Sequence, residues 1–143
     1  EQTAMQWVKE NTPVDSQFLV LTGEPEAMCE SSTEWFPALA ERTSLSTLQG
    51  MEWLIGNKFG EFIGYRAGIQ SCTDEWLECL KREAGYFGVD YDYIYVSIKT
   101  PTNNCKPVDT SRQSTRSIIL ALDGSPEYTI AYKTNDAVVF IKK

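Results

Sequence analysis

The sequence predicts an α/β domain: a layered, mainly parallel, Rossmann-like sheet with helices on both faces and a C-terminal antiparallel hairpin. The apolar run Gln17–Leu21 is typical of a strand buried on both faces of a parallel sheet. Helical and strand patterns alternate along most of the chain, as they do in βαβ units. Two short strands at the end flank the turn 134–136. The 143 residues fit a single domain spanning 1–143.

The first half of the chain predicts two helices and two strands. Ala4, Trp7 and Val8 share a helical face, and Pro13 ends that helix. The strand 17–21 and an acidic loop follow. Ser32 or Thr33 is expected to cap a helix over 34–41. Residues 44–48 are a short strand candidate.

A glycine at every fourth position from 56 to 68 opens the second half, and we expect close backbone packing or a loose loop there. A helix is predicted from 73–74 to a stop at Gly85, followed by a strand over 90–98. Ser111 is expected to cap a helix that ends at Gly124. The closing strands are 128–132 and 137–141.

The absence of histidine excludes Ser-His-Asp and Cys-His catalysis and His-ligated zinc. The net charge of −7 disfavours nucleic acid as a partner. Residues 1–41 hold eight acidic side chains and one basic, so the whole excess lies there. Glu24, Glu26 and Glu30 lack the spacing of a calcium loop, and we expect them to be solvated. Glycine-rich nucleotide-binding motifs are absent, so no cofactor is predicted. No metal is predicted either, because the sequence has no histidine and no calcium-loop spacing.

The four cysteines allow three disulfide pairings, of which we favour Cys72–Cys79 with Cys29–Cys105. In an unbroken helix Cys72 and Cys79 would lie about 10 Å apart, too far to bridge. The pair therefore requires that the helix begin after Cys72, near Trp76. Cys29 and Cys105 lie in the loops that follow the first and third strands. Disulfides indicate an oxidising compartment, and buried free thiols in a cytosolic protein are the alternative.

Two Glu-Trp dipeptides flank a polar segment and form the candidate ligand site, which consists of Glu34, Trp35, Gln49, Glu52 and Trp53. A tryptophan ring beside a carboxylate or amide suits a sugar, because the ring covers apolar C–H patches and the polar groups bind hydroxyls. Glu34 and Glu52 are also candidates for the acid/base pair of a small glycosidase, with carboxyls about 5–10 Å apart. Alternatively, both tryptophans belong to the core and the glutamates are solvated.

Three parts of the sequence resemble a known family. The opening Trp7-Val8-Lys9-Glu10-Asn11-Thr12-Pro13 is similar to the W-[LV]-[RK]-E-N-T-P start of the domain after the last membrane helix in polytopic, lipid-linked-sugar glycosyltransferases. The C-terminal part of such domains is also similar to this chain. The similarity covers the helix at 117–122, the tripeptide Pro126-Glu127-Tyr128 and the final strands. The Glu34–Pro37 and Gln49–Trp53 stretches look like those of uncharacterised bacterial members.

The resemblance implies a soluble extracytoplasmic domain, excised from a bacterial membrane protein, that carries no catalytic residue of its own. Its implied partners are the transmembrane portion of the parent protein and a saccharide or lipid-linked sugar. The Trp-Trp-Asp motif of oligosaccharyltransferases is absent. No apolar run approaches the ~18 residues of a membrane span. A purely structural or protein-interaction domain is the remaining alternative.

Overall fold

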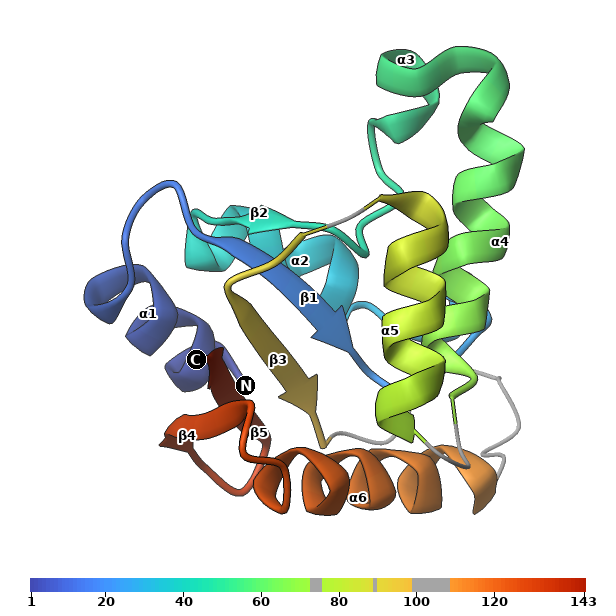
Figure 1. Cartoon of the computed structure of the whole chain (residues 1–143). Helices are drawn as coiled ribbons and strands as arrows, with labels where there is room; N and C mark the ends of the chain where they lie inside the picture. The colour runs from blue at the N-terminus through green and yellow to red at the C-terminus, as the bar shows by residue number, and fades with distance from the viewer. Residues whose placement is uncertain (73–75, 89, 99–108) are drawn as a thin grey trace.

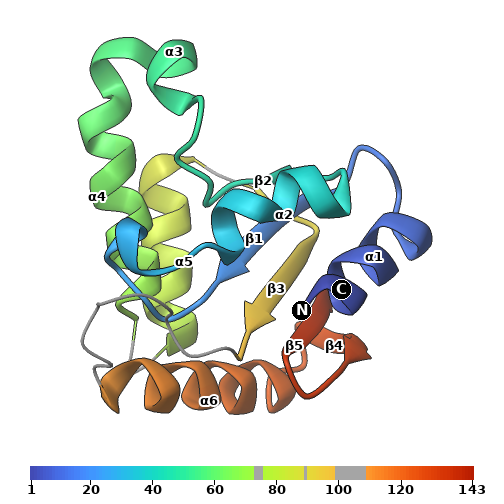
Figure 2. The same cartoon turned by 180° about the vertical axis from the view of Figure 1, so that it is seen from behind.

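The computed structural model of the chain describes residues 1–72, 76–88, 90–98 and 109–143. Within them a five-stranded sheet in the order β2-β1-β3-β5-β4 has helices on both faces (Figures 1 and 2). The strands are β1 (Gln17–Leu21), β2 (Thr43–Ser44), β3 (Tyr93–Ser97), β4 (Tyr128–Lys133) and β5 (Ala137–Lys142). The helical elements are α1 (Gln2–Asn11), η1 (Ala27–Cys29), α2 (Ser32–Ala40), α3 (Met51–Ile55), η2 (Gly56–Lys58), α4 (Phe59–Gln70), α5 (Trp76–Phe87) and α6 (Asp109–Asp123).

The sheet is mixed. β1 pairs in parallel with β2 and β3, whereas β5 runs antiparallel to both β3 and β4. The predicted α/β class and the antiparallel closing hairpin are therefore confirmed. Parallel pairing is confined to the β2-β1-β3 side of the sheet.

Two apolar layers bury the two faces of the sheet. Phe18 and Val20 point to the layer formed with α1 and α2. Leu19 and Leu21 point to the layer formed with α4, α5 and α6. Because both sets of side chains are fully buried, β1 is a central strand of the kind that its continuous apolar run predicts.

The end of α1 explains the sequence that follows Trp7. Asn11 Nδ2 donates to the Trp7 carbonyl, and Thr12 Oγ1 donates to the Val8 carbonyl, which also accepts from Thr12 N, so side chains add hydrogen bonds to the last turns of the helix. The buried Arg42 donates to the Lys9 and Thr12 carbonyls from the end of α2. These residues thus fix α1 to α2.

The predicted strand at 44–48 is reduced to Thr43–Ser44. The Leu45 N–H still donates to the Phe18 carbonyl at 2.8 Å. At the next position the Ser46 hydroxyl, rather than a backbone carbonyl, accepts from Val20 N. A side chain thus replaces the backbone ladder, and the strand ends there.

The glycine column lies in helix, so the expectation of a loose loop was wrong. Gly60 and Gly64 have no atom within 4 Å of where a Cβ would stand, so close packing does not explain them, whereas at Gly68 the Glu83 carboxylate of α5 lies 2.8 Å from that position. Burial of Phe62, Tyr65 and Ile69 against the sheet holds α4 together despite its weak intrinsic propensity.

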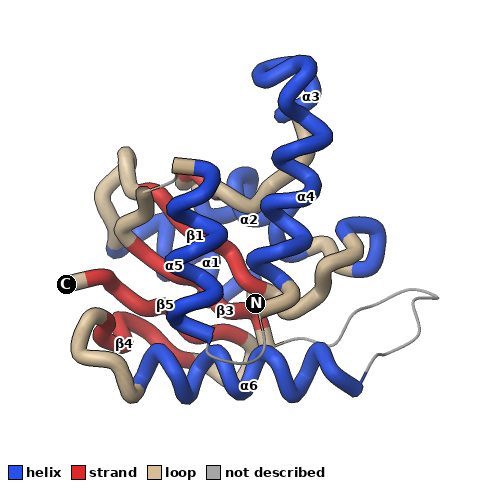
Figure 3. Tube along the Cα trace, turned by 45° about the vertical axis from the view of Figure 1, so that its right-hand side comes forward, coloured by secondary structure: helices blue, strands red, loops and turns tan. Residues whose placement is uncertain are grey.

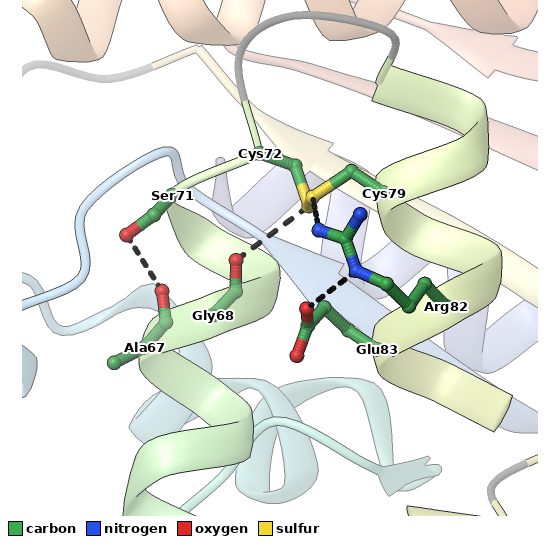
Figure 4. The surroundings of a disulfide bond; sticks show 7 residues. All are labelled: Ala67, Gly68, Ser71, Cys72, Cys79, Arg82 and Glu83. Atoms are coloured by element: carbon green, nitrogen blue, oxygen red, sulfur yellow. Dashed lines mark hydrogen bonds and ion pairs between the residues drawn. A yellow bond between two sulfur atoms is a disulfide. The ribbon is translucent and has the colours of Figure 1, made fainter. Parts of the chain in front are cut away.

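The Cys72–Cys79 disulfide is confirmed, with Cα atoms 5.8 Å apart. Cys72 follows the end of α4, and α5 begins at Trp76, as the pairing required (Figure 4). Cys29 is also disulfide-bonded, and its predicted partner Cys105 lies outside the described residues. α5 continues past the predicted stop at Gly85 to Phe87, and Gly88 follows with φ of +66°.

Candidate functional site

The carboxyl end of β1, the usual ligand edge of an open α/β sheet, is occupied by a side chain of α4. Buried Gln70 accepts hydrogen bonds from Thr22 N at 2.8 Å and Gly23 N at 3.1 Å through Oε1. Its amide nitrogen donates to the Val20 carbonyl. Since these donors already have partners, a ligand cannot use them without displacing Gln70.

The acidic loop after β1 is only partly solvated. The Glu30 carboxylate forms a buried ion pair with Arg66 of α4, whose side chains are 5% and 1% exposed. Arg66 also donates to the Pro25 carbonyl at 2.9 Å. Glu24 is buried too and accepts from Glu26 N. The expectation that all three glutamates are solvated was therefore wrong, because Arg66 binds both the Glu30 carboxylate and the backbone of the loop.

The structure links two of the predicted site residues through the backbone. The Glu34 carboxylate accepts one hydrogen bond from Leu48 N and one from Gln49 N, both 3.0 Å long. The segment after β2 is thereby fastened to α2. Glu52 is exposed on α3. With both oxygens held by backbone donors, Glu34 acts as a structural acceptor.

Replacing Glu34 with alanine is expected to lower the free energy of unfolding by about 1–3 kcal/mol, because two backbone donors lose a charged acceptor. Urea unfolding monitored by tryptophan fluorescence measures the change. Glu52→Ala is the matched control and should alter stability by less than about 0.5 kcal/mol, as is usual at an exposed site. Equal effects of the two substitutions would contradict the role given to Glu34.

Trp35 lies on the exposed side of α2 and lines a pocket of about 310 Å³ between α1 and α2. Its side chain is 60% exposed. Polar groups of the pocket include Gln2 and the hydroxyls of Ser31 and Ser32. An aromatic ring, an amide and hydroxyls therefore meet in one hollow.

Two serines that were not among the predicted site residues lie at this pocket, Ser32 in its lining and Ser97 next to Ser32. Ser32 Oγ and Ser97 Oγ both donate to the same carboxylate oxygen of Glu1, over 2.6 and 2.5 Å. Ser97 ends β3 and Ser32 begins α2, so the contact lies at the carboxyl edge of the parallel strands. The sequence indicated Ser32 only as a candidate helix cap and Ser97 only as a residue near the end of the predicted strand 90–98.

Trp53 is in different surroundings. It lies on α3, which packs against η2 and α4 rather than α2. Figures 1 and 3 show α3 and the start of α4 standing out from the body of the domain. Trp53 and Leu54 are 86% and 79% exposed there, and we call this pair the α3 tip. Both predicted tryptophans are thus exposed, but they belong to separate features.

Buried phenols of the domain stay neutral. Burial, with smaller contributions from Glu1 and Asp136, raises the pKa of Tyr95 above its ordinary value. Burial likewise raises the pKa of Tyr91, helped by the hydrogen bond between its hydroxyl and that of Tyr128 at 2.8 Å. These groups carry no charge at neutral pH and supply no base to the pocket.

Fold and pocket together define an α/β domain with an aromatic, hydroxyl-lined hollow beside the carboxyl ends of β1 and β3. Comparison of the sequence with protein-family models and with curated proteins found no match. Among the described residues no helix is both long and apolar enough to cross a membrane. The same residues hold no cluster of three or more acidic or cysteine side chains suited to a metal ion.

Proposed function

We propose that the chain is a non-catalytic, extracytoplasmic domain, with Rossmann-like layering, of a polytopic membrane protein similar to the lipid-linked-sugar glycosyltransferases. In this proposal the domain positions a saccharide for chemistry performed elsewhere in the parent protein. The observation that carries it is the exposed ring of Trp35 beside a pocket with amide and hydroxyl groups. An aromatic face with a few convergent polar groups is how proteins bind sugars.

The two backbone hydrogen bonds that Glu34 accepts favour a binding domain over a glycosidase. A glycosidase needs two carboxyls free to exchange protons and flank the scissile bond. Glu34 instead accepts from Leu48 N and Gln49 N. The side chain of Trp35, its neighbour on α2, is exposed and therefore accessible to a ligand.

The disulfides support the extracytoplasmic location. Cys72 and Cys79 are joined, and Cys29 is also bonded. Disulfides persist mainly in oxidising compartments.

The α3 tip favours a second candidate function, that of an interaction domain that packs against the membrane portion of its parent. Exposed large apolar side chains that gather at one place often mark a contact surface. Trp53 and Leu54 lie together on the projecting α3 and add little to the core. The two functions are compatible, because the tip and the Trp35 pocket are separate.

Trp35→Ala is expected to raise the dissociation constant for a bound saccharide at least tenfold, because the stacking surface is removed. Isothermal titration calorimetry of the 143-residue chain with mannose, glucose and N-acetylglucosamine measures it. Trp53→Ala is the matched control, because Trp53 is also exposed but lies outside the pocket, and it should leave binding unchanged. If none of the sugars binds, or if Trp35→Ala binds as well as the wild type, the proposed saccharide site is wrong.

A further inference from the structure

A second hollow adjoins the Trp35 pocket. It has a volume of about 600 Å³ and is lined by Thr3, Gln6, Trp7, Glu10 and Tyr132, together with Gln2 and Leu39. Gln2 and Leu39 also line the Trp35 pocket, so the two hollows meet at these side chains. Both volumes lie within the range of about 300–1,000 Å³ that is usual for small-molecule sites.

An aromatic pair forms one wall of the second hollow. The rings of Trp7 from α1 and Tyr132 from β4 are stacked, with centroids 4.6 Å apart and planes 8° from parallel. Both side chains are partly exposed. Each ring fixes the other, so the wall is held in place by elements from opposite ends of the chain.

Polar groups stand beside these rings. Gln6 Nε2 donates to Glu10 Oε1 at 2.6 Å across one turn of α1, and both side chains are exposed. With Thr3 they offer an amide, a carboxylate and a hydroxyl next to an aromatic surface. This repeats the combination found around Trp35 and suits sugar hydroxyls and C–H faces.

The charged side chains that line the two hollows are both carboxylates, Glu1 and Glu10, and the α-ammonium of Glu1 is paired with Asp136. Lys9, the basic residue of α1, is paired with Glu41 instead. An anionic sugar would therefore meet like charge along this surface, whereas a neutral sugar would not.

We infer that the two hollows are neighbouring subsites for one neutral oligosaccharide, which would lie across Gln2 and Leu39 from Trp35 to the Trp7–Tyr132 pair. This inference rests on the proposed function and adds the ligand's class and length. A sugar long enough to occupy both hollows gains a second aromatic contact and hydrogen bonds to Gln6 and Glu10 without a second association event, so it binds more tightly than a monosaccharide.

The test is a length series measured by calorimetry on the 143-residue chain. The probes are N-acetylglucosamine with its β1,4-linked oligomers of two to five units, and mannose with its α1,2-linked oligomers. We expect affinity to rise at least tenfold from the monosaccharide to the tetrasaccharide in the series that binds. Tetragalacturonate, an anionic oligomer, should bind at least tenfold more weakly than the neutral tetrasaccharide.

Gln6→Ala and Glu10→Ala test the second subsite. Both residues are exposed on α1, so the fold should persist, which an unchanged melting temperature would verify. We expect these variants to lose most of the gain with length while retaining monosaccharide affinity. Glu61→Ala, at an exposed position on α4, is the control.

The outcomes separate the two proposals. Monosaccharide binding that depends on Trp35 but does not strengthen with length overturns the extended site and leaves the proposed function standing. The extended site is also wrong if the gain with length survives both α1 substitutions. Absence of binding by every neutral sugar overturns the proposed function and the extended site together.

Discussion

Replacing Arg66 with leucine is expected to lower the free energy of unfolding by about 3–5 kcal/mol, the usual cost of leaving one partner of a buried ion pair uncompensated. The guanidinium is 1% exposed and reaches both the Glu30 carboxylate and the Pro25 carbonyl. Glu30 in turn accepts from Thr33 N, so the start of α2 would loosen as well. Urea unfolding monitored by tryptophan fluorescence measures the loss.

Arg82→Leu is the matched control for this change. Arg82 lies on α5 with its side chain 70% exposed and pairs with Glu83 at 3.3 Å. Exposed ion pairs are worth about 0–1 kcal/mol. The double variant Glu30→Gln with Arg66→Met should recover part of the stability, because no charge is then left buried alone. Equal losses from the two leucine substitutions would contradict the buried-pair account.

Replacing Cys72 and Cys79 together with serine is expected to lower the free energy of unfolding by about 2–3 kcal/mol, from the chain entropy of the short loop that the disulfide closes. The bridge holds the end of α4 against the start of α5, as Figure 4 shows. Cys72 is also buried in the core layer of α4 and α5, so serine at this position adds a desolvation cost. Urea unfolding without reductant measures the difference.

Thiol titration of the denatured protein provides the second measurement. The wild type should release no thiol before reduction and four after it, and the double variant none before and two after. Two or more free thiols in the unreduced wild type would contradict the disulfides. Four would also remove their support for an extracytoplasmic location.

The sequence was most informative where burial acts locally, whereas the predicted cap at Ser32 or Thr33 was wrong, because α2 begins at Ser32 itself. The run 17–21 has apolar side chains on both faces of β1, so a continuous apolar strand was the only pattern compatible with its place in the sheet. Cys72 and Trp76 were correctly placed on either side of a helix break, since the reach of a disulfide demands it. The closing hairpin follows from turn residues and period-two patterning.

Tertiary contacts decided what the sequence could not. Nothing near Glu30 indicates that Arg66, 36 positions later, neutralises it. Gln70 fills the edge after β1 through three hydrogen bonds to residues about 50 positions away. In the candidate site, both predicted tryptophans are exposed. Whether the two tryptophan side chains share a surface depends on where the chain after β2 places α3.

The Trp7–Tyr132 pair is the clearest omission. Trp7 was assigned to the inner face of a helix, and Tyr132 to an ordinary strand position. Their stacking requires that β4 lie beside α1, which depends on the strand order β3-β5-β4, in which β5 rather than β4 pairs with β3. Local pattern contains no information on that order.

The α3 tip has a consequence for how this sequence tolerates change. Trp53 and Leu54 are among the most exposed large apolar side chains of the described chain, and α3 buries none of its residues fully. Substitutions at these two positions therefore leave the core intact, while they change the surface that the projecting end presents. Fold stability and the composition of this surface depend on separate residues, so the surface can drift or be redesigned at constant fold stability.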